Sequence, residues 1–549
     1  MAGRIAASGM RIHLRPGLVS CLFLLASAAG SADEATATRR VQAHTAFLAD
    51  DLLEGRGTGS RGFALAARYV ASQFARIGIE PGADGGFEQP VKFLEAANKL
   101  EAGRFIIRHD GQEDSLAPLN DMLTFAAHGE TAAELTAPAV FVGFGVQAPE
   151  SDYNDYSGID VKGKIVVCLS GAPTRFPSEQ RAHHSNLDQK RAVAVNHGAV
   201  GFVMIRTPRD ESHRPWPVVA AQLRFPAMRL LDEKGAVVDG FPELRAVATL
   251  PSASAGRVLV ASGHTAEEVL AKAERGEPQS FPLNVSLTLA GAADVRPVDA
   301  ANVLGWLPGL DPALARKPIV ITAHLDHLGI GAPVNGDSIY NGAMDNAIGV
   351  ALILAIAEDL ATGPRLARPV LFAALCGEEK GLLGANHLAL HPPARVQRFA
   401  ANLNIDMTLF PAPVRDIIPW GASHTTLGAA VDAAAARRGF TVSPDPIPDE
   451  TIFVRSDQYP FVRAGVPAVY VGTGQNSKDP AVDIPAAWDR FLRERYHKPA
   501  DDMNQPVDWP STGAYAALVE DLTRDLAGNA TDPAWLPGDF FGELFGRDR

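Results

Sequence analysis

The second half of this 549-residue chain alternates two kinds of apolar pattern. From about residue 290 onward, short continuous apolar runs typical of buried strands are separated by longer runs with helical spacing. Such alternation is typical of a mostly parallel sheet covered by helices, and it predicts an α/β fold. The expected strands lie at 319–323, 369–375, 402–405 and 468–471, and the expected helices at 346–360, 423–438 and 512–527.

Residues 120–280 have a different character, because short β-rich runs separated by turn signals dominate there. We predict a small separate β-rich module here, and a chain of this length is expected to form more than one unit. The predicted division is a signal segment at 1–32, the first part of the main domain at 33–119, the module at 120–280, the rest of the main domain at 281–530 and a tail at 531–549.

The first 32 residues have the pattern of an export signal. Arg4, Arg11 and Arg15 precede an apolar run from Leu18 to Ala29, and small residues suited to cleavage follow. The run is too short to span a bilayer, and no later segment is apolar enough to do so. The sequence therefore predicts a periplasmic or extracellular protein without a membrane span.

The net charge argues against one class of partner, and the two remaining cysteines are not expected to form a disulfide. Removal of the three signal arginines lowers the net charge from −13 to −16, which argues against nucleic acid as a partner because phosphate binding needs a basic surface. Cys168 and Cys376 lie in apolar runs, so we expect buried free thiols. The oligomeric state is left open.

Polar side chains of metal-binding type follow the predicted strands. Ligands gather at the C-terminal ends of parallel strands, so these side chains are expected to meet at one edge. A serine hydrolase would show a Gly-x-Ser-x-Gly elbow at such an end, and the sequence has none. The residues are His324-Leu325-Asp326-His327 after the first strand, Glu378-Glu379 after the second, Asp406 after the third, and Asp345 at the start of a helix.

Carboxylates that converge on one edge repel each other and need a cation, and histidine with carboxylate is a zinc-type ligand set. Two imidazoles and three carboxylates exceed the needs of one zinc ion with an open position. They suit two metals, about 3.5–4 Å apart, bridged by one carboxylate and one water. Since Glu378 and Glu379 are adjacent, they point to opposite sides of an extended segment, so one can bind metal while the other acts as general base.

Each of these features has a simpler interpretation when taken alone. Asp345 or Asp406 could cap a helix, His-x-Asp-His could be a surface motif, and Glu378-Glu379 could lie in a solvated turn. Their common position at strand ends favours a metal centre.

Five motifs in this order resemble the co-catalytic zinc aminopeptidases, a family that includes aminopeptidase Y and, more distantly, glutamate carboxypeptidase and glutaminyl cyclase. The motifs are Ala323-His324-Leu325-Asp326-His327-Leu328-Gly329, Asn341-Gly342-Ala343-Met344-Asp345-Asn346, Gly377-Glu378-Glu379-Lys380-Gly381-Leu382-Leu383-Gly384, Asn404-Ile405-Asp406-Met407 and Arg495-Tyr496-His497-Lys498-Pro499-Ala500-Asp501. Residues 48–82 also resemble the N-terminal part of secreted bacterial members, and residues from about 135 to 280 resemble a protease-associated domain.

The resemblance implies a role for each site residue. His324 and Asp406 would bind one zinc ion, Glu379 and His497 the other, and Asp345 would bridge the two Zn²⁺. Glu378 would be the general base, and Asp326 would orient the histidine or the bridging carboxylate. No local pattern distinguishes His497 from a surface histidine. Ser456-Asp457-Gln458 stands where several relatives carry Ser-Asp-His, in a segment that usually lines the substrate pocket.

The implied reaction is removal of N-terminal residues from peptides with a free N-terminus, and an acidic site suits a cationic α-amine. A carboxypeptidase or dipeptidase on the same scaffold is the first alternative; it would need an arginine cluster, for which Arg455 and Arg463 are candidates. A glutaminyl cyclase, or an inactive receptor-like protein, is a further alternative, and the complete ligand set argues against both.

Overall fold

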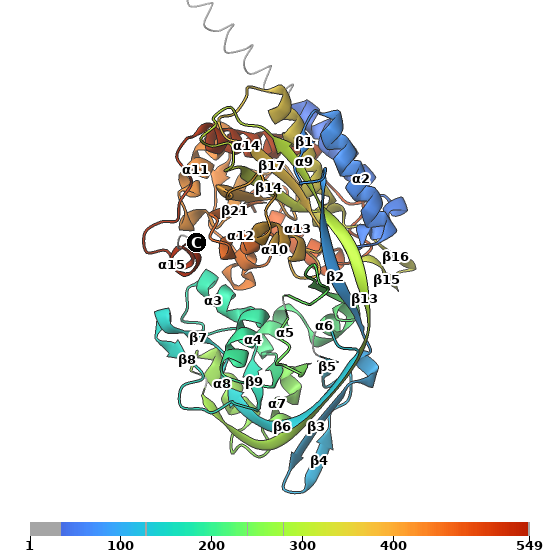
Figure 1. Ribbon diagram of the computed structural model, residues 1–549, viewed down its shortest axis with the longest axis vertical. Coiled ribbons are helices and arrows are strands. Elements are labelled where there is room, and N and C mark those ends of the chain that lie inside the picture. The colour runs from blue at the N-terminus through green and yellow to red at the C-terminus, as the bar shows by residue number, and fades with distance from the viewer. Residues whose placement is uncertain (1–33, 127–128, 239, 278, 547–549) are drawn as a thin grey trace, which may run out of the picture.

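The computed structural model describes residues 34–126, 129–238, 240–277 and 279–546, and the predicted signal segment lies outside these residues. Figure 1 shows two lobes connected by two long strands, β2 (Glu88–Asn98) and β13 (Ser280–Leu307). These strands pair antiparallel from Ala293↔Asn98 to Val303↔Glu88. Within the described ranges, no helix is both long and apolar enough to cross a bilayer.

The upper lobe contains the predicted parallel sheet. Its four central strands run parallel in the order β17 (Val370–Leu375), β14 (Ile319–His324), β18 (Ala401–Asn404) and β21 (Ala468–Thr473). The end of β13 pairs antiparallel with β17, and β19 (Asp416–Trp420) pairs antiparallel with β21. The predicted α/β fold is confirmed.

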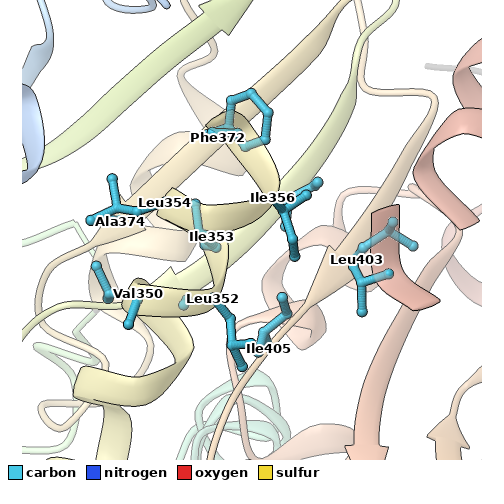
Figure 2. Packing of buried hydrophobic residues seen from close by; sticks show 14 of the residues in the cluster. Val350, Leu352, Ile353, Leu354, Ile356, Phe372, Ala374, Leu403 and Ile405 are labelled. Carbon is cyan, nitrogen blue, oxygen red and sulfur yellow. The ribbon is translucent and has the colours of Figure 1, made fainter. Parts of the chain in front are cut away.

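Helices cover both faces of this sheet, because its strands are apolar on both sides. In β14, Ile319 and Ile321 face the core beneath α9 (Ile348–Thr362), while Val320 faces the opposite core. Figure 2 shows α9 side chains packed against residues of β17 and β18. The core around α9 also contains side chains of α2 (Arg61–Arg76), α11 (Leu427–Arg437) and α14 (Trp509–Gly528). Two separate apolar clusters contain side chains of α10 (Leu383–Leu390) and α12 (Gln458–Arg463). Each large aliphatic side chain buried here contributes about 1.5–3 kcal/mol.

The lower lobe is built on a second sheet that shares β13. Parallel strands β6 (Ala132–Val142), β9 (Ile165–Leu169), β10 (Gly201–Ile205) and β12 (Ala246–Leu250) form its centre. The first half of β13 pairs with β6 and with β3 (Arg104–His109), and β12 pairs with β5 (Leu123–Ala126). The chain therefore passes between the lobes along continuous strands. The domain boundaries at 120 and 280 remain predictions.

The helix α3 (Ser178–Ser185) of the lower lobe contacts the upper lobe. Other helices of the lower lobe are α4 (Leu187–Asn196), α5 (Pro208–His213), α6 (Trp216–Gln222) and α8 (Ala266–Glu274). On α3, His183 Nδ1 lies 2.6 Å from Tyr459 Oη of α12, and Ser178 Oγ donates to the Pro448 carbonyl at 2.6 Å. Cys168 and Cys376 are both buried and free, as predicted.

Candidate metal centre

The candidate ligands lie where the predicted strands end. His324 is the last residue of β14, Glu378 and Glu379 follow β17, and Asp406 follows β18. Asp345 lies in the helical turn Ala343–Ala347 before α9, and the peptide bond after it is cis. His497 lies beyond α13 (Ile484–Glu494). The structure thus brings together all five candidate ligands predicted from the sequence.

A first group of donors consists of His324, Asp345 and Asp406. The His324 Nε2 atom lies 3.2 Å from Asp345 Oδ1 and 3.1 Å from Asp406 Oδ1. The other carboxylate oxygen of Asp406 accepts a hydrogen bond from Ser456 Oγ at 2.6 Å, which fixes the rotation of the carboxylate.

A second group shares Asp345 with the first. The His497 Nε2 atom lies 3.2 Å from both Asp345 Oδ2 and Glu379 Oε2. His327 also belongs to this group, since its Nδ1 atom lies 2.6 Å from Glu379 Oε1. Asp345 therefore presents one oxygen to each group, which is the arrangement of a bridging carboxylate.

The buried charges strongly shift the pKa values of these groups. Burial would raise the pKa of Glu379, but His497 and His327 hold it well below its usual range. Burial would lower the pKa of His497, but Glu379 and Asp345 raise it to about 10. Burial, together with Glu379 and Asp406, raises the pKa of Glu378 well above its usual range. The carboxylates of the second group thus favour the charged form, whereas Glu378 favours a bound proton.

The donor set fits divalent zinc. A tetrahedral zinc ion with bonds of about 2.0–2.1 Å separates its ligand atoms by about 3.3 Å. The distances from His324 Nε2 and His497 Nε2 to the neighbouring carboxylate oxygens, 3.1–3.2 Å, are close to that value. In addition, Glu379 Oε1 is buried and has no hydrogen-bond partner among the described residues, as expected for a metal-facing oxygen.

Asp326 supports the site through its carboxylate and its carbonyl group. Its carboxylate accepts hydrogen bonds from Thr58 Oγ1 at 2.7 Å and from the backbone N–H of Glu378 at 3.2 Å. Its carbonyl oxygen lies 3.0 Å from His324 Nδ1. The imidazole is thus oriented by the backbone of Asp326, while the carboxylate holds the backbone of Glu378.

Two buried residues fix the loops around Asp345. Asp501 accepts hydrogen bonds from the backbone N–H groups of Met344 and Asp345, both at 3.1 Å. The Arg56 guanidinium donates to the carbonyl groups of Leu48, Leu325, Asn341 and Gly342. Asp501 lies in one of the five motifs and Arg56 in the segment 48–82, but the roles of both depend on contacts with segments distant in the chain.

The segment with the unusual glutamine lies inside the protein. Gln458 is fully buried; its side-chain oxygen accepts from Asn404 at 2.9 Å and its amide donates to the Phe453 carbonyl at 2.7 Å. Asn404, the last residue of β18, also donates to Ser456 Oγ at 2.8 Å. Gln458 therefore helps to hold Asn404 and, through it, Ser456.

Comparison with known proteins identifies two families along the chain and a shared fold. Residues 302–523 match peptidase family M28, and residues 110–236 match the PA domain. An aminopeptidase from Aneurinibacillus sp. strain AM-1 superposes with a TM-score of 0.51 at 17% identity, covering 92% of this chain and 97% of that one. At this identity, the likeness establishes a shared fold.

Two further solved structures match this chain over most of its length and of their own. A zinc aminopeptidase from Bacillus subtilis has a TM-score of 0.44 and 18% identity, covering 90% of this chain and 96% of its own. A peptidase M28 precursor from Shewanella amazonensis SB2B has a TM-score of 0.44 and 16% identity, covering 92% and 99%.

The fold and the donor groups define a metal-dependent peptidase with an α/β core. The chain carries a peptidase family M28 domain at residues 302–523 and an inserted PA domain at residues 110–236.

Proposed function

We propose that this protein is a two-zinc aminopeptidase that removes N-terminal residues from peptides. The observation that carries the proposal is that Asp345 is shared between two donor groups beside the buried acid Glu378. His324 and Asp406 would hold one zinc ion, Glu379 and His497 the other, and Asp345 would bridge them. When bound, such a pair of ions activates a water molecule and polarises the scissile carbonyl.

Glu378 is proposed as the general base. Its backbone is held by Asp326. Burial and neighbouring carboxylates raise the pKa of Glu378, and bound cations would oppose this by favouring the carboxylate form that accepts a proton. The Glu378 carboxylate would accept the proton of the attacking water and deliver it to the leaving amine.

The acidic character of the site favours a free α-amine over a terminal carboxylate. A carboxypeptidase needs arginine to bind the terminal carboxylate, but Arg455 is already 3.1 Å from the carboxylate of Glu450. Carboxypeptidase or dipeptidase activity is the alternative proposal. The N-terminal pattern of positive, apolar and small residues supports export as a further part of the proposal.

Mass-spectrometric analysis of matched peptides, free or N-acetylated, tests the proposal. We expect the zinc-loaded protein to shorten only the free peptides, stepwise from the N-terminus. Glu378→Ala should lower the rate by about 10²–10⁴-fold while leaving the metal content unchanged. C-terminal shortening, or equal cleavage of acetylated peptides, would favour the alternative. Absence of any cleavage with zinc bound would refute the peptidase proposal.

A further inference from the structure

His327 is a buried imidazole that has no role in the five-ligand arrangement. Its side chain is 0% exposed, and its Nδ1 atom lies 2.6 Å from Glu379 Oε1 and 3.8 Å from Asp345 Oδ2. Its ring centre is 5.7 Å from that of His497. His327 and His497 therefore face the same two carboxylates from different segments of the chain.

The hydrogen bonds expected of a buried imidazole are missing at His327. Neither ring nitrogen has a hydrogen-bond partner among the described residues, and Glu379 Oε1 has none either. The 2.6 Å contact between Nδ1 and Oε1 therefore brings two atoms together that both lack a partner with hydrogen-bond geometry. Unpartnered buried polar atoms are rare in folded proteins, and an ion or a water molecule usually accounts for them. Here, two such atoms face each other inside a metal-binding group.

The backbone holds the His327 ring in this position. The His327 N–H donates to the Arg56 carbonyl at 3.2 Å. Gly342 packs against the ring so closely that a Cβ atom there would lie 2.5 Å from His327 Cγ. Gly342 also has a φ of +59°, a conformation that favours glycine. The ring is thus packed with one nitrogen towards Glu379.

We propose that His327 is a sixth protein ligand, which binds through Nδ1 the cation held by Asp345, Glu379 and His497. This inference rests on the proposed metal centre. The first position would then have three protein donors, whereas the second would have four, including two imidazoles. Three donors leave a coordination position open for water or substrate, and four resemble a closed site. The second position should therefore bind zinc more tightly and favour zinc over manganese.

Zinc titration of metal-free protein against a competing chelator tests the inference. The test compares the wild type with His327→Asn, with His324→Asn and with the control His387→Asn, whose ring lies 5.0 Å from that of His391. We expect His327→Asn to weaken one site by at least about 10-fold, the lower limit for loss of a supporting partner at a metal site. His324→Asn should weaken the other site, and His387→Asn neither. Unchanged zinc affinity in a folded His327→Asn would overturn the proposal.

A second measurement needs only the wild type and remains decisive if His327→Asn fails to fold. Proton NMR of the cobalt-substituted protein resolves the exchangeable ring N–H of each metal-bound imidazole, because the paramagnetic ion shifts it far from other signals. Three such signals are expected, from His324, His327 and His497, and two would contradict the inference.

The titration also separates this inference from the proposed function. If the wild type binds a single zinc ion that His327→Asn weakens, the two-metal proposal fails and the ligand assignment is supported. If it binds two zinc ions that His327→Asn leaves unaffected, the ligand assignment fails while the two-metal proposal stands. Neither outcome depends on peptide cleavage.

Discussion

The backbone N–H of Glu378 donates a hydrogen bond to the carboxylate of Asp326, 3.2 Å away. This bond connects the segments that follow β14 and β17, and therefore connects the first histidine ligand to the proposed base. The second carboxylate oxygen of Asp326 is occupied by Thr58 Oγ1 at 2.7 Å. Because both carboxylate oxygens accept hydrogen bonds, we expect Asp326 to affect the reaction by holding the backbone of Glu378 in place.

Replacing Asp326 with alanine should loosen Glu378 and lower kcat/KM by about 10–100-fold, the range found for supporting residues at metal sites. Asp326→Asn should have a smaller effect, since the amide can still accept from Glu378 and donate to Thr58. Peptide hydrolysis at saturating zinc is the measurement. Thr58→Val is the control, because it removes the other partner of Asp326 but keeps the hydrogen bond from Glu378. Equal activities of wild type and Asp326→Ala would contradict the assigned role.

The central sheet could be predicted because its strands are buried on both faces. Residues 319–323 are apolar except for Thr322, and all are buried. Only the C-terminal end of such a strand is free for polar ligands, so His324 follows from the pattern. By contrast, the 28-residue strand β13 pairs with β6, β3 and β17 at different points along its length. The alternation of apolar and polar residues predicts a strand but not its partners, so this pairing could not be predicted.

Other parts of the site depend on contacts between distant segments. His497 and Asp501 lie in a loop without periodicity, and only the family resemblance assigned His497. Arg56 stabilises loops almost 290 residues away in sequence, which no local pattern can indicate. His327 was visible in a strand-end motif, but its two unpartnered nitrogens are a property of the packed structure.

Arg56→Met should destabilise the protein by about 3 kcal/mol or more and reduce zinc affinity. Arg56 is fully buried, and its removal would leave the carbonyl groups of Leu325, Asn341 and Gly342 without their donor. Urea unfolding of metal-free protein measures the first effect, and chelator competition the second. Arg61→Met is a suitable control because its side chain is 75% exposed and its ion pair with Glu54 should contribute little. Equal unfolding midpoints for Arg56→Met and Arg61→Met would be incompatible with this role.

His424 should make the contact between the lobes dependent on pH. Its two ring nitrogens contact Glu179 of α3 and Asp539 at the start of α15 (Phe540–Phe545), while Phe453 and Phe541 pack against the ring. Burial lowers the pKa of His424, but Glu179 and Asp539 reverse this effect and raise it above the usual value. Because the pKa of His424 is higher in the folded state than in the unfolded state, its protonation stabilises the folded protein. This stabilisation is complete below about pH 6.5, the pKa of an unperturbed histidine, and is lost as the pH rises through the folded-state pKa.

We therefore expect the free energy of unfolding to fall between neutral and alkaline pH through this group alone. Comparison of urea unfolding for wild type and His424→Asn across this range is the measurement, and the difference between them should shrink as pH rises. A difference that is constant or grows with pH would refute the charged contact.

Lys190 should be essential for the stability of the lower lobe. Its ammonium group is fully buried and donates to the carbonyl groups of Phe144 at 2.6 Å, Leu169 at 2.8 Å and Gly171. Lys190→Met fills most of the same volume but leaves these three carbonyl groups without their shared donor. Since each unsatisfied buried group costs about 1–3 kcal/mol, the loss should be at least about 3 kcal/mol.

Hydrogen exchange measured by mass spectrometry should localise this loss. Exchange should accelerate in β9 and β10, which lie next to these carbonyl groups, and remain unchanged in β14 and β17. Lys272→Met, which removes a surface contact with Glu268 at 2.9 Å on α8, should leave all four strands unchanged. Because Lys190 lies in the other lobe from the metal-binding groups, zinc affinity of Lys190→Met should equal that of the wild type. Accelerated exchange in β14 as well would instead mean that the two lobes unfold as one cooperative unit through β13.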